Sequence, residues 1–361
     1  MDKYAAALAG CPRLGSKHMR ELIEYFHIPE NVWKASDDDI RQSQLLKGKT
    51  LESFFSWRHE TEPDRIEEEM YQKGVRSVTF EEEDYPYLLR NTINPPAVLF
   101  YKGTLPADEK MMAIVGSRKA TSYGIQTAGN FASGLAAEGV TIVSGGARGI
   151  DSAAHRGALR SHGKTVVVAA FGLDRVYPPE NRNLFAQIIE EGGALISEYP
   201  LGTPPLGRQF PARNRIIAGL CRGVIVVEAA ERSGSLITSD FALEEGRDVF
   251  SVPGSIYIPS CAGTNQLIRN GAICCTSFEN VLAEYGWNKK EEKKEKIYLD
   301  QLTLQEELVY RFCCTENEVT AEEIIQQSGL SVVTVTMVLL QLQLKGYIKE
   351  TGPGRYMILR S

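Results

Sequence analysis

The middle of the chain alternates between short, continuously apolar runs and segments in which apolar residues recur at helical spacing. The apolar runs include AIVG (113–116), TIVSGG (141–146), TVVVAAFG (165–172) and GVIVVEAA (223–230), and VRSVTF (75–80) is a further predicted strand. Helical segments of about 10–15 residues separate them, a spacing that indicates strand–helix–strand units. Apolar strands that alternate with helices form parallel sheets covered on both faces. The pattern predicts an α/β domain with a doubly wound, mainly parallel sheet over residues 66–287.

The two ends of the chain have other patterns. Apolar residues at helical spacing in ELIEYF (21–26) and a capped helix start at Ser36 predict a helical domain over residues 1–65. The run NKKEEKKEK has no apolar residue and predicts a charged, solvated linker over residues 288–298. Three helical segments and a hairpin follow this run, and they predict a winged-helix-like domain over residues 299–361.

Composition and charge narrow the class of protein. The chain has 361 residues and a formal net charge of −6, so a nucleic-acid site would be a local patch rather than a basic surface. None of the seven cysteines has the CxxC spacing of a metal knuckle, and we expect reduced, mostly buried thiols. No apolar run approaches the roughly 20 residues of a membrane span, and the N-terminus lacks the layout of a signal peptide. These features predict a cytoplasmic protein without membrane contact.

Turns rich in glycine and serine follow several of the predicted strands. In parallel sheets, ligands bind at the carboxyl ends of the strands. Bare backbone N–H groups at a helix start suit a phosphate, and an arginine adds a fork that matches phosphate oxygens. For each of these turns, considered by itself, the alternative is a tight connection between strand and helix that binds no ligand. The candidate anion-binding residues are Gly116, Ser117 and Arg118 in the first turn, Ser144, Gly145, Gly146, Arg148, Gly149 and Asp151 in the second, and Ser233, Gly234 and Ser235 in a third.

The segment GRQFPARNRIIAG (207–219) places several arginines around one aromatic residue. Arg208, Arg213 and Arg215 cluster near Phe210. In proteins that bind single strands, arginines follow the phosphates while an aromatic ring stacks on a base, which is worth about 1–3 kcal/mol. The alternative is a network of arginine salt bridges with Phe210 in the core. The segment is therefore a second candidate for contact with nucleic acid.

The sequence does not match the common nucleotide-binding or catalytic motifs. In SGGARGID (144–151) a serine stands where the dinucleotide fingerprint needs glycine, and the next strand ends without the acidic residue that binds a ribose. The lysine of a Walker loop is missing as well. His155 lies in the helix after this turn, but no metal-ligand spacing surrounds it. We expect no catalytic residue, no metal and no cofactor.

The core of the chain carries an ordered set of motifs between about Val75 and Tyr285. They are GSR (116–118), SGGARGID (144–151), YPPEN (177–181), SEYP (197–200), FPARNRIIAGL (210–220), VVEA (226–229), SGSLIT (233–238), VFSVPG (249–254) and GTNQLIRNGA (263–272). This set resembles the DNA-processing protein A family, also called Smf. The two ends of the chain look like the N-terminal helical region and the C-terminal winged-helix domain of that family.

The resemblance implies an extended Rossmann-like fold that binds single-stranded DNA without a nucleotide cofactor. It also implies a homodimer that protects incoming strands during natural transformation and helps load the RecA recombinase onto strands covered by single-strand-binding protein. Carried over by motif, Arg118, the turn 144–151 and the segment 210–215, which includes Asn214, would line the DNA pocket. Arg208 is the nearest match to a basic residue that family members often carry before FPARNR. The resemblance thus implies a non-catalytic mediator.

Two departures from the family pattern, and one apolar segment, bear on partners. Arg13 stands where a helix-hairpin-helix needs glycine, which argues against DNA contact by the N-terminal helices. The segment SVVTVTMVLLQLQLKG (331–346) has Lys345 as its one charged residue, whereas helices that read a major groove carry several polar or basic side chains. We therefore expect that the winged helix is not the main DNA reader. The candidates for the dimer interface are Leu267, Ile268 and Ile273. The alternative is that these residues pack in the core of the domain.

Two other functions stay open. The segment SGSLITSD (233–240), with Thr238 and Asp240, partly mimics the turn P-G-G-x-G-T-x-x-E with which cytokinin-activating phosphoribohydrolases hold a nucleotide phosphate. Its glycine pair is lost, however, and the spacing differs. The two terminal modules would also fit a protein-interaction scaffold, although the arginines around Phe210 argue against it. Nucleotide hydrolysis would favour the enzyme, and an absence of DNA binding would favour the scaffold.

Overall fold

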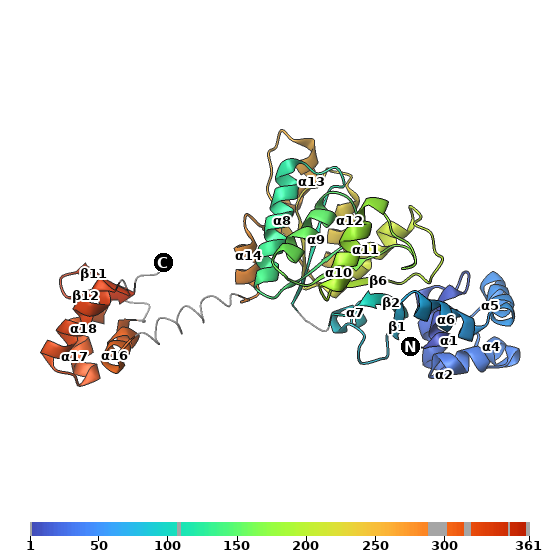
Figure 1. The fold of residues 1–361 in the computed structure, drawn as a ribbon, viewed down its shortest axis with the longest axis horizontal. Coiled ribbons are helices and arrows are strands. Elements are labelled where there is room, and N and C mark those ends of the chain that lie inside the picture. Colours follow the sequence, from blue (N-terminus) through green and yellow to red (C-terminus); the bar gives the residue numbers. More distant parts are fainter. Residues whose placement is uncertain (1, 107–109, 288–301, 314–318, 346, 359–361) are drawn as a thin grey trace. The chain divides into compact units, whose positions relative to one another are not determined.

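The computed structural model describes residues 2–106, 110–287, 302–313, 319–345 and 347–358. The chain forms two compact units, Met1–Trp287 and Asn288–Ser361, and each is described by itself. Figure 1 shows their helices and strands in chain colours. No helix among the described residues is long and apolar enough to cross a membrane.

A large sheet forms the centre of the first unit. Its strands are β1 (Arg76–Thr79), β2 (Val98–Gly103), β3 (Met111–Val115), β4 (Thr141–Ser144), β5 (Thr165–Val168), β6 (Ala194–Ser197), β7 (Gly223–Val226), β8 (Asp248–Ser251) and β9 (Ile273–Cys274). In space they lie in the order β1-β2-β6-β5-β4-β3-β7-β8-β9. Neighbours from β6 to β9 are parallel, whereas β2 is antiparallel to both β1 and β6. The predicted α/β fold with a mainly parallel sheet is confirmed.

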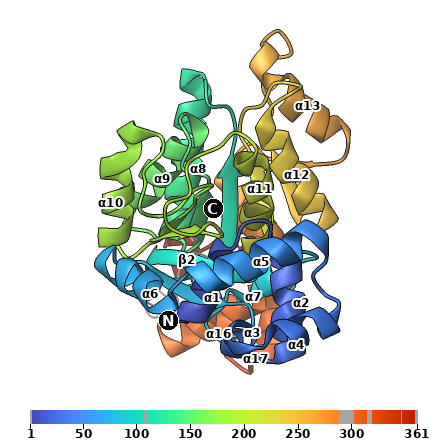
Figure 2. The ribbon, with the colours of Figure 1, turned by 90° about the vertical axis from the view of Figure 1, so that its right-hand side faces the viewer.

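Helices cover both faces of this sheet, as Figure 2 shows. One face holds α8 (Ser122–Ala137), α9 (Ile150–Arg160), α10 (Arg182–Glu190) and α14 (Phe278–Glu284), and the other holds α7 (Tyr87–Arg90), α11 (Gln209–Leu220) and α12 (Gly234–Glu244). In β3, Met112 and Ile114 pack on the first face, while Ala113 and Val115 pack on the second. A strand buried on both faces needs an apolar residue at every position, which is why the continuous apolar runs predicted these strands.

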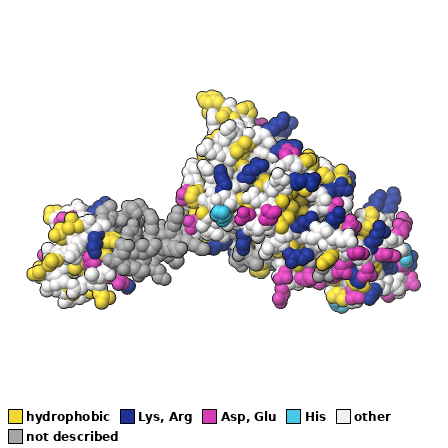
Figure 3. Space-filling model, in the orientation of Figure 1, with side chains coloured by type: hydrophobic (Ala, Val, Ile, Leu, Met, Phe, Trp, Pro, Cys, Tyr) yellow, Lys and Arg dark blue, Asp and Glu magenta, His cyan; other side chains and the backbone are white. Residues whose placement is uncertain are grey.

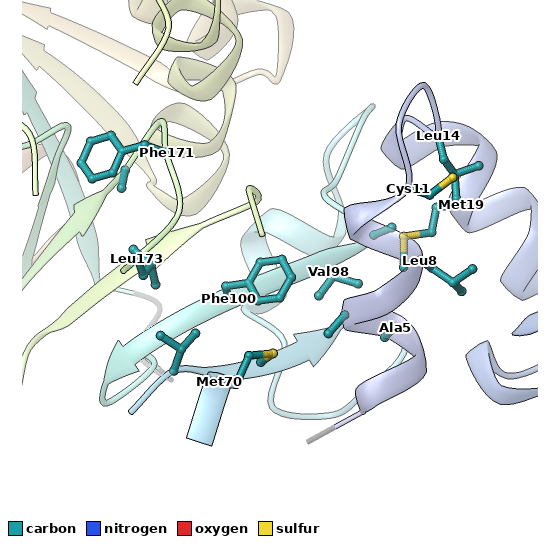
Figure 4. Close-up of a cluster of buried hydrophobic side chains, with 14 of the residues drawn as sticks. Ala5, Leu8, Cys11, Leu14, Met19, Met70, Val98, Phe100, Phe171 and Leu173 are labelled. Carbon is teal, nitrogen blue, oxygen red and sulfur yellow. The ribbon is translucent and has the colours of Figure 1, made fainter. Parts of the chain in front are cut away.

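The N-terminal helices share a core with the sheet. They are α1 (Lys3–Gly10), α2 (Ser16–Phe26), α3 (Pro29–Lys34), α4 (Asp37–Ser43), α5 (Gly48–Glu60) and α6 (Pro63–Gln72). Leu8 and Met70 of these helices belong to the same apolar cluster as Val98 and Phe100 of β2 (Figure 4). The domain boundary expected at residue 65 falls inside α6, and the helices belong to the same compact unit as the sheet.

The second unit contains α16 (Leu304–Cys313), α17 (Ala321–Ser328) and α18 (Val332–Leu344), with the strands β10 (Val319–Thr320), β11 (Ile348–Gly352) and β12 (Arg355–Ile358). The strands form an antiparallel sheet in the order β10-β12-β11. Three helices and a hairpin are the elements that the sequence predicts here, and the assignment as a winged helix stays a prediction. The expected charged linker, 288–298, lies outside the described residues.

The predicted helix start at Ser36 is confirmed by its cap, and Thr320 caps a second helix in the same way. The Ser36 hydroxyl accepts the backbone N–H of Asp39 at 3.1 Å at the start of α4. The Thr320 hydroxyl accepts the backbone N–H of Glu323 at 3.2 Å at the start of α17. In both helices the acidic residue also accepts the backbone N–H of the cap, so two otherwise unpaired amides are satisfied.

Candidate nucleic-acid interface

The predicted turns meet at the carboxyl edge of the central sheet. Strand β3 lies between β4 and β7, so the turns that follow these three strands are neighbours. Helices α8, α9 and α12 begin at these turns. In doubly wound sheets, ligands bind in the crevice where the strand order reverses. In this chain a groove of about 660 Å³ lies at that point.

Most of the predicted anion-binding residues line this groove. They come from all three turns and from the arginine-rich segment, and they are Gly116, Ser117, Arg118, Asp151, Phe210, Arg213, Asn214, Ser233, Gly234 and Ser235. Lys119, Tyr177 and Thr238 line it as well, although the sequence did not assign them to DNA. The signals that could have found the first two were the position of Lys119 beside Arg118 and the YPPEN motif that begins at Tyr177.

Phe210 lies half-buried in the groove with two arginines close to its ring. The guanidinium carbon of Arg118 lies 5.2 Å from the ring centroid, and that of Arg213 lies 6.0 Å away. These distances suit cation–π contacts. The ring of Tyr177 packs beside Phe210 with a centroid separation of 5.7 Å. Phe210 belongs to none of the apolar cores of the described chain, so the alternative that buried it in a core is wrong.

Arg118 and Arg213 carry their charges in different surroundings. Arg118 is exposed, and it forms no ion pair within the described part of the chain. Arg213 is buried, and its Nη1 donates to the backbone carbonyl oxygens of Gly145, at 2.9 Å, and Val168. Burial lowers the pKa of Arg213 to about 10, so the guanidinium stays charged at pH 7. Of these two arginines, Arg118 therefore presents its charge to solvent, and Arg213 is held in place by the fold.

Gly145 and Asp151 complete the surroundings of the Arg213 side chain. A Cβ atom on Gly145 would lie 2.6 Å from Arg213 Nη2 and 2.8 Å from Asp151 Oδ2, so only glycine fits between them. Burial raises the pKa of Asp151, and the charge of Arg213 opposes that rise. The carboxylate also accepts the backbone N–H of Ala147 at 3.2 Å. Asp151 thus braces the turn from the start of α9.

Ser144, Gly146 and Gly149 shape the second turn without lining the groove. The Ser144 hydroxyl donates to the backbone carbonyl of Ile114 at 2.6 Å. Gly146 and Gly149 both have left-handed backbones, with φ of 67° and 73°. A Cβ atom on Gly149 would lie 2.2 Å from the carbonyl oxygen of Ser117. Gly149 therefore allows the second turn to approach the first.

Three of the predicted arginines lie outside the lining of the groove. Arg148 forms an ion pair with Glu180 on the protein surface. Arg215 forms a largely buried ion pair with Glu198. Arg208 is exposed at the N-cap of α11. The contribution of these arginines to DNA binding stays a prediction.

The groove holds little that could carry catalysis. Asp151 is the one carboxylate among the described residues that line it. Asp240, which the enzyme alternative needs, is exposed and lies outside the lining. His155 is fully buried, with Nδ1 at 2.7 Å from the Thr165 hydroxyl, and burial lowers its pKa to about 3. No group of three or more His, Cys, Asp or Glu within the described ranges is placed to hold a metal ion.

The charge of the groove is opposite to that of the whole chain. Arg118, Lys119 and Arg213 face a single lining carboxylate, Asp151, in a chain of net charge −6. Figure 3 shows acidic side chains gathered instead over the N-terminal part of the first unit. The groove is therefore a local basic patch. Because the whole chain is negatively charged, such a patch is where an anionic ligand would bind.

The groove lies within a stretch that matches one known protein family. The model of the family described as DNA recombination-mediator protein A matches residues 76–286. The chain belongs to this family. The resemblance predicted from the motifs is thereby confirmed. The match includes every residue that lines the groove, from Val115 to Thr238.

Individual relatives of this recombination-mediator family match the chain as well. Protein Smf from Synechocystis sp. is 36% identical over 389 residues, which cover 98% of each chain. The X-ray structure of DNA processing protein A from Streptococcus pneumoniae is 37% identical, with a TM-score of 0.67 over 79% of this chain and 98% of that one. DNA processing protein A from Helicobacter pylori is 29% identical, with a TM-score of 0.53 over 58% of this chain and 95% of that one. The Helicobacter pylori structure is described as giving insight into a unique single-stranded DNA binding mode.

Proposed function

We propose that this recombination-mediator chain binds single-stranded DNA in the groove, largely independently of base sequence. The observation that carries the proposal is the half-buried ring of Phe210, with the guanidinium groups of Arg118 and Arg213 at 5.2 and 6.0 Å from its centroid. Such a ring offers a base a stacking contact worth about 1–3 kcal/mol, while the cations follow the phosphates. Neither contact depends strongly on which base is present.

A single strand fits this site better than a duplex does. In a duplex each base is stacked between its neighbours, so a ring can reach a base face only if the base leaves the stack. The start of α12 adds backbone N–H groups that suit a phosphate, and Ser233, Gly234 and Ser235 of this start line the groove. Asn214 connects α11 to it, since its side-chain amide donates to the carbonyl of Gly234 at 3.3 Å. The DNA-binding mode described for the Helicobacter pylori relative supports the same ligand.

We also infer that the chain is a binding protein without catalytic activity. A hydrolase of the phosphoribohydrolase kind must present a carboxylate to its ligand. Asp240 lies outside the groove, and Asp151 is engaged by the backbone N–H of Ala147 beside the Arg213 guanidinium. The groove thus supplies contacts for an anion without a free general base. No cofactor enters this proposal.

The proposed role is that of a homodimeric mediator that helps load RecA recombinase onto strands covered by single-strand-binding protein, in natural transformation or another recombination route. The description of the family as a recombination mediator supports this role. For the dimer, Leu267 and Ile268 lie on α13 (Ala262–Arg269) and Ile273 lies in β9, and all three are half-buried. Leu267 and Ile273 also pack against the core, so Ile268 is the candidate with the freest side chain.

Fluorescence anisotropy with a labelled dT oligonucleotide and a duplex of the same length tests the proposed ligand. We expect the full chain to bind the single strand at least about tenfold more tightly than the duplex, because the stacking contact is lost in the duplex. Equal affinity for both, or no binding at low salt, would contradict the proposal. Nucleotide hydrolysis by the unaltered chain would favour the enzyme instead. Sedimentation velocity on the same sample tests the dimer.

A further inference from the structure

Glu228 is a fully buried carboxylate just after strand β7. Its oxygens lie 3.1 and 3.3 Å from the backbone N–H of Thr121, and one of them accepts the Thr121 hydroxyl at 2.6 Å. Thr121 is the N-cap of helix α8. No cation among the described residues forms an ion pair with Glu228. The carboxylate is therefore stabilised by the positive end of α8 and by the donors of its cap.

The side chain of Glu228 binds Thr121, which ends the loop 116–121, and the backbone of Glu228 binds the start of this loop. Its carbonyl oxygen accepts the backbone N–H of Ser117 at 2.7 Å. A Cβ atom on Gly116 would lie 2.9 Å from that carbonyl oxygen, and one on Gly124 would lie 2.4 Å from Glu228 Oε2. The two glycines thus let the loop and the first turn of α8 close around this one residue. Both ends of the loop 116–121 are tied to Glu228.

The position that Glu228 occupies is one at which related sheets bind phosphate. Helix α8 follows β3, where the strand order reverses, and in dinucleotide-binding folds the start of the corresponding helix holds a pyrophosphate. We propose that Glu228 stands in for this phosphate and is a positioning residue of the groove. It fixes the loop 116–121 so that Arg118 and Lys119 line the groove, and it leaves the start of α12 to a phosphate of the ligand. The inference rests on the proposed function.

A double-mutant cycle on DNA affinity tests the positioning role. Glu228→Gln keeps an oxygen for Thr121 and removes the charge. We expect this change to raise the Kd for a dT oligonucleotide by about fivefold in the wild-type background but by less than about twofold in the double variant Arg118→Ala/Lys119→Ala, because the two sets of changes remove the same contribution. A wild-type Kd in Glu228→Gln would overturn the role. So would a fivefold loss that persists in Arg118→Ala/Lys119→Ala.

Glu245→Gln is the matched control. Glu245 also accepts a backbone N–H through both carboxylate oxygens, that of Ile93 at 3.1 Å, but it lies outside the groove. Its replacement by glutamine should leave the Kd within about twofold of wild type, since sites that share no partner act independently. A loss in Glu245→Gln equal to that in Glu228→Gln would mean that general stability, and not the loop, determines the affinity, and would overturn the role.

Rescue by an anion gives a readout that needs no DNA. Glu228→Ala removes the carboxylate from the start of α8. Formate, added at constant ionic strength, should raise the Tm of this variant saturably and leave the Tm of Glu245→Ala unchanged. If Glu228→Ala is unfolded without formate, recovery of the folded state with formate is the same result. Equal behaviour of the two variants in formate would overturn the stand-in role. If the wild type does not bind dT, the proposed function is wrong. The formate experiment would still test whether the Glu228 carboxylate occupies an anion site at the start of α8.

Discussion

Arg213 Nη1 donates a hydrogen bond to the backbone carbonyl of Gly145 at a distance of 2.9 Å. The same nitrogen donates to the carbonyl of Val168, so one buried cation joins helix α11 to the ends of β4 and β5. This bond connects the glycine turn to the arginine-rich segment around Phe210. The Arg213 guanidinium thus lines the groove and also links two segments that form it, the glycine turn after β4 and helix α11.

Replacement of Arg213 by alanine should lower stability as well as DNA affinity. Hydrogen bonds to a charged donor contribute about 1.5–3 kcal/mol each, so the loss of both should reduce the free energy of unfolding by about 3 kcal/mol or more. Urea denaturation measures this change. Arg213→Lys keeps the charge but not the planar fork, and it should recover only part of the stability. A loss below about 1 kcal/mol in Arg213→Ala would show that the two carbonyls do not depend on this side chain.

Gly149→Ala should be much more damaging than Gly192→Ala. Both glycines have positive φ, 73° and 79°, but a Cβ on Gly149 would lie 2.2 Å from the Ser117 carbonyl while one on Gly192 meets nothing within 4 Å. Gly192→Ala should cost about 1 kcal/mol of backbone strain. Gly149→Ala should cost at least about 2 kcal/mol more, because the two turns must separate. Thermal or urea unfolding compares the pair, and similar losses would rule out the close approach of the turns.

The central sheet could be predicted from the sequence because strands buried on both faces must be apolar at every position. That the turns and the Phe210 segment lie together also follows from the fold class, since the carboxyl ends of parallel strands share one edge. The antiparallel pairing of β2 did not follow, because it depends on a long-range register, such as Phe100 opposite Ser197, that no local pattern records.

The arginines show where sequence patterns stop being informative. Arg148 and Arg215 have the same local context as the groove arginines, yet they pair with Glu180 and Glu198. Those partners are set by the tertiary fold, since they lie 32 and 17 residues away along the chain. The contact between Glu228 and Thr121 is still harder to predict from a local pattern, because Thr121 lies 107 residues earlier in the chain.

The buried imidazole of His155 should make stability depend on pH. Burial lowers its pKa to about 3 from an ordinary 6.5, so the unfolded chain takes up the proton first as the pH falls. The stability that neutral His155 contributes is therefore complete above about pH 6.5 and is lost as the pH falls toward 3. From pH 7.5 to 5 this group should cost about 2 kcal/mol. Urea denaturation at both pH values should show the gap between wild type and His155→Gln shrinking by that amount; a constant gap would contradict it.

Helix α18 should contribute little to DNA binding. Lys345, which follows it, forms an ion pair with Glu306 at 2.7 Å, so its charge is already compensated within the second unit. Lys345→Ala should change the Kd for a dT oligonucleotide by less than about twofold, since no phosphate contact is lost. Anisotropy on the full chain measures this, and a tenfold loss would assign DNA contact to this unit. The exposed residues of α18 include no charged side chain within the helix, and four of them are the apolar Val333, Met337, Leu340 and Leu344.

The most direct test of the account is a salt series of anisotropy titrations with dT, comparing wild type, Arg118→Ala and Phe210→Ala. Each phosphate contact contributes about 0.7 to the slope of log affinity against log salt, so Arg118→Ala should flatten that slope by about 0.7. Phe210→Ala should weaken binding by about 1–3 kcal/mol and leave the slope nearly unchanged. If both variants bind dT as wild type does, with the same slope, the strand does not lie in this groove and the central claim is wrong.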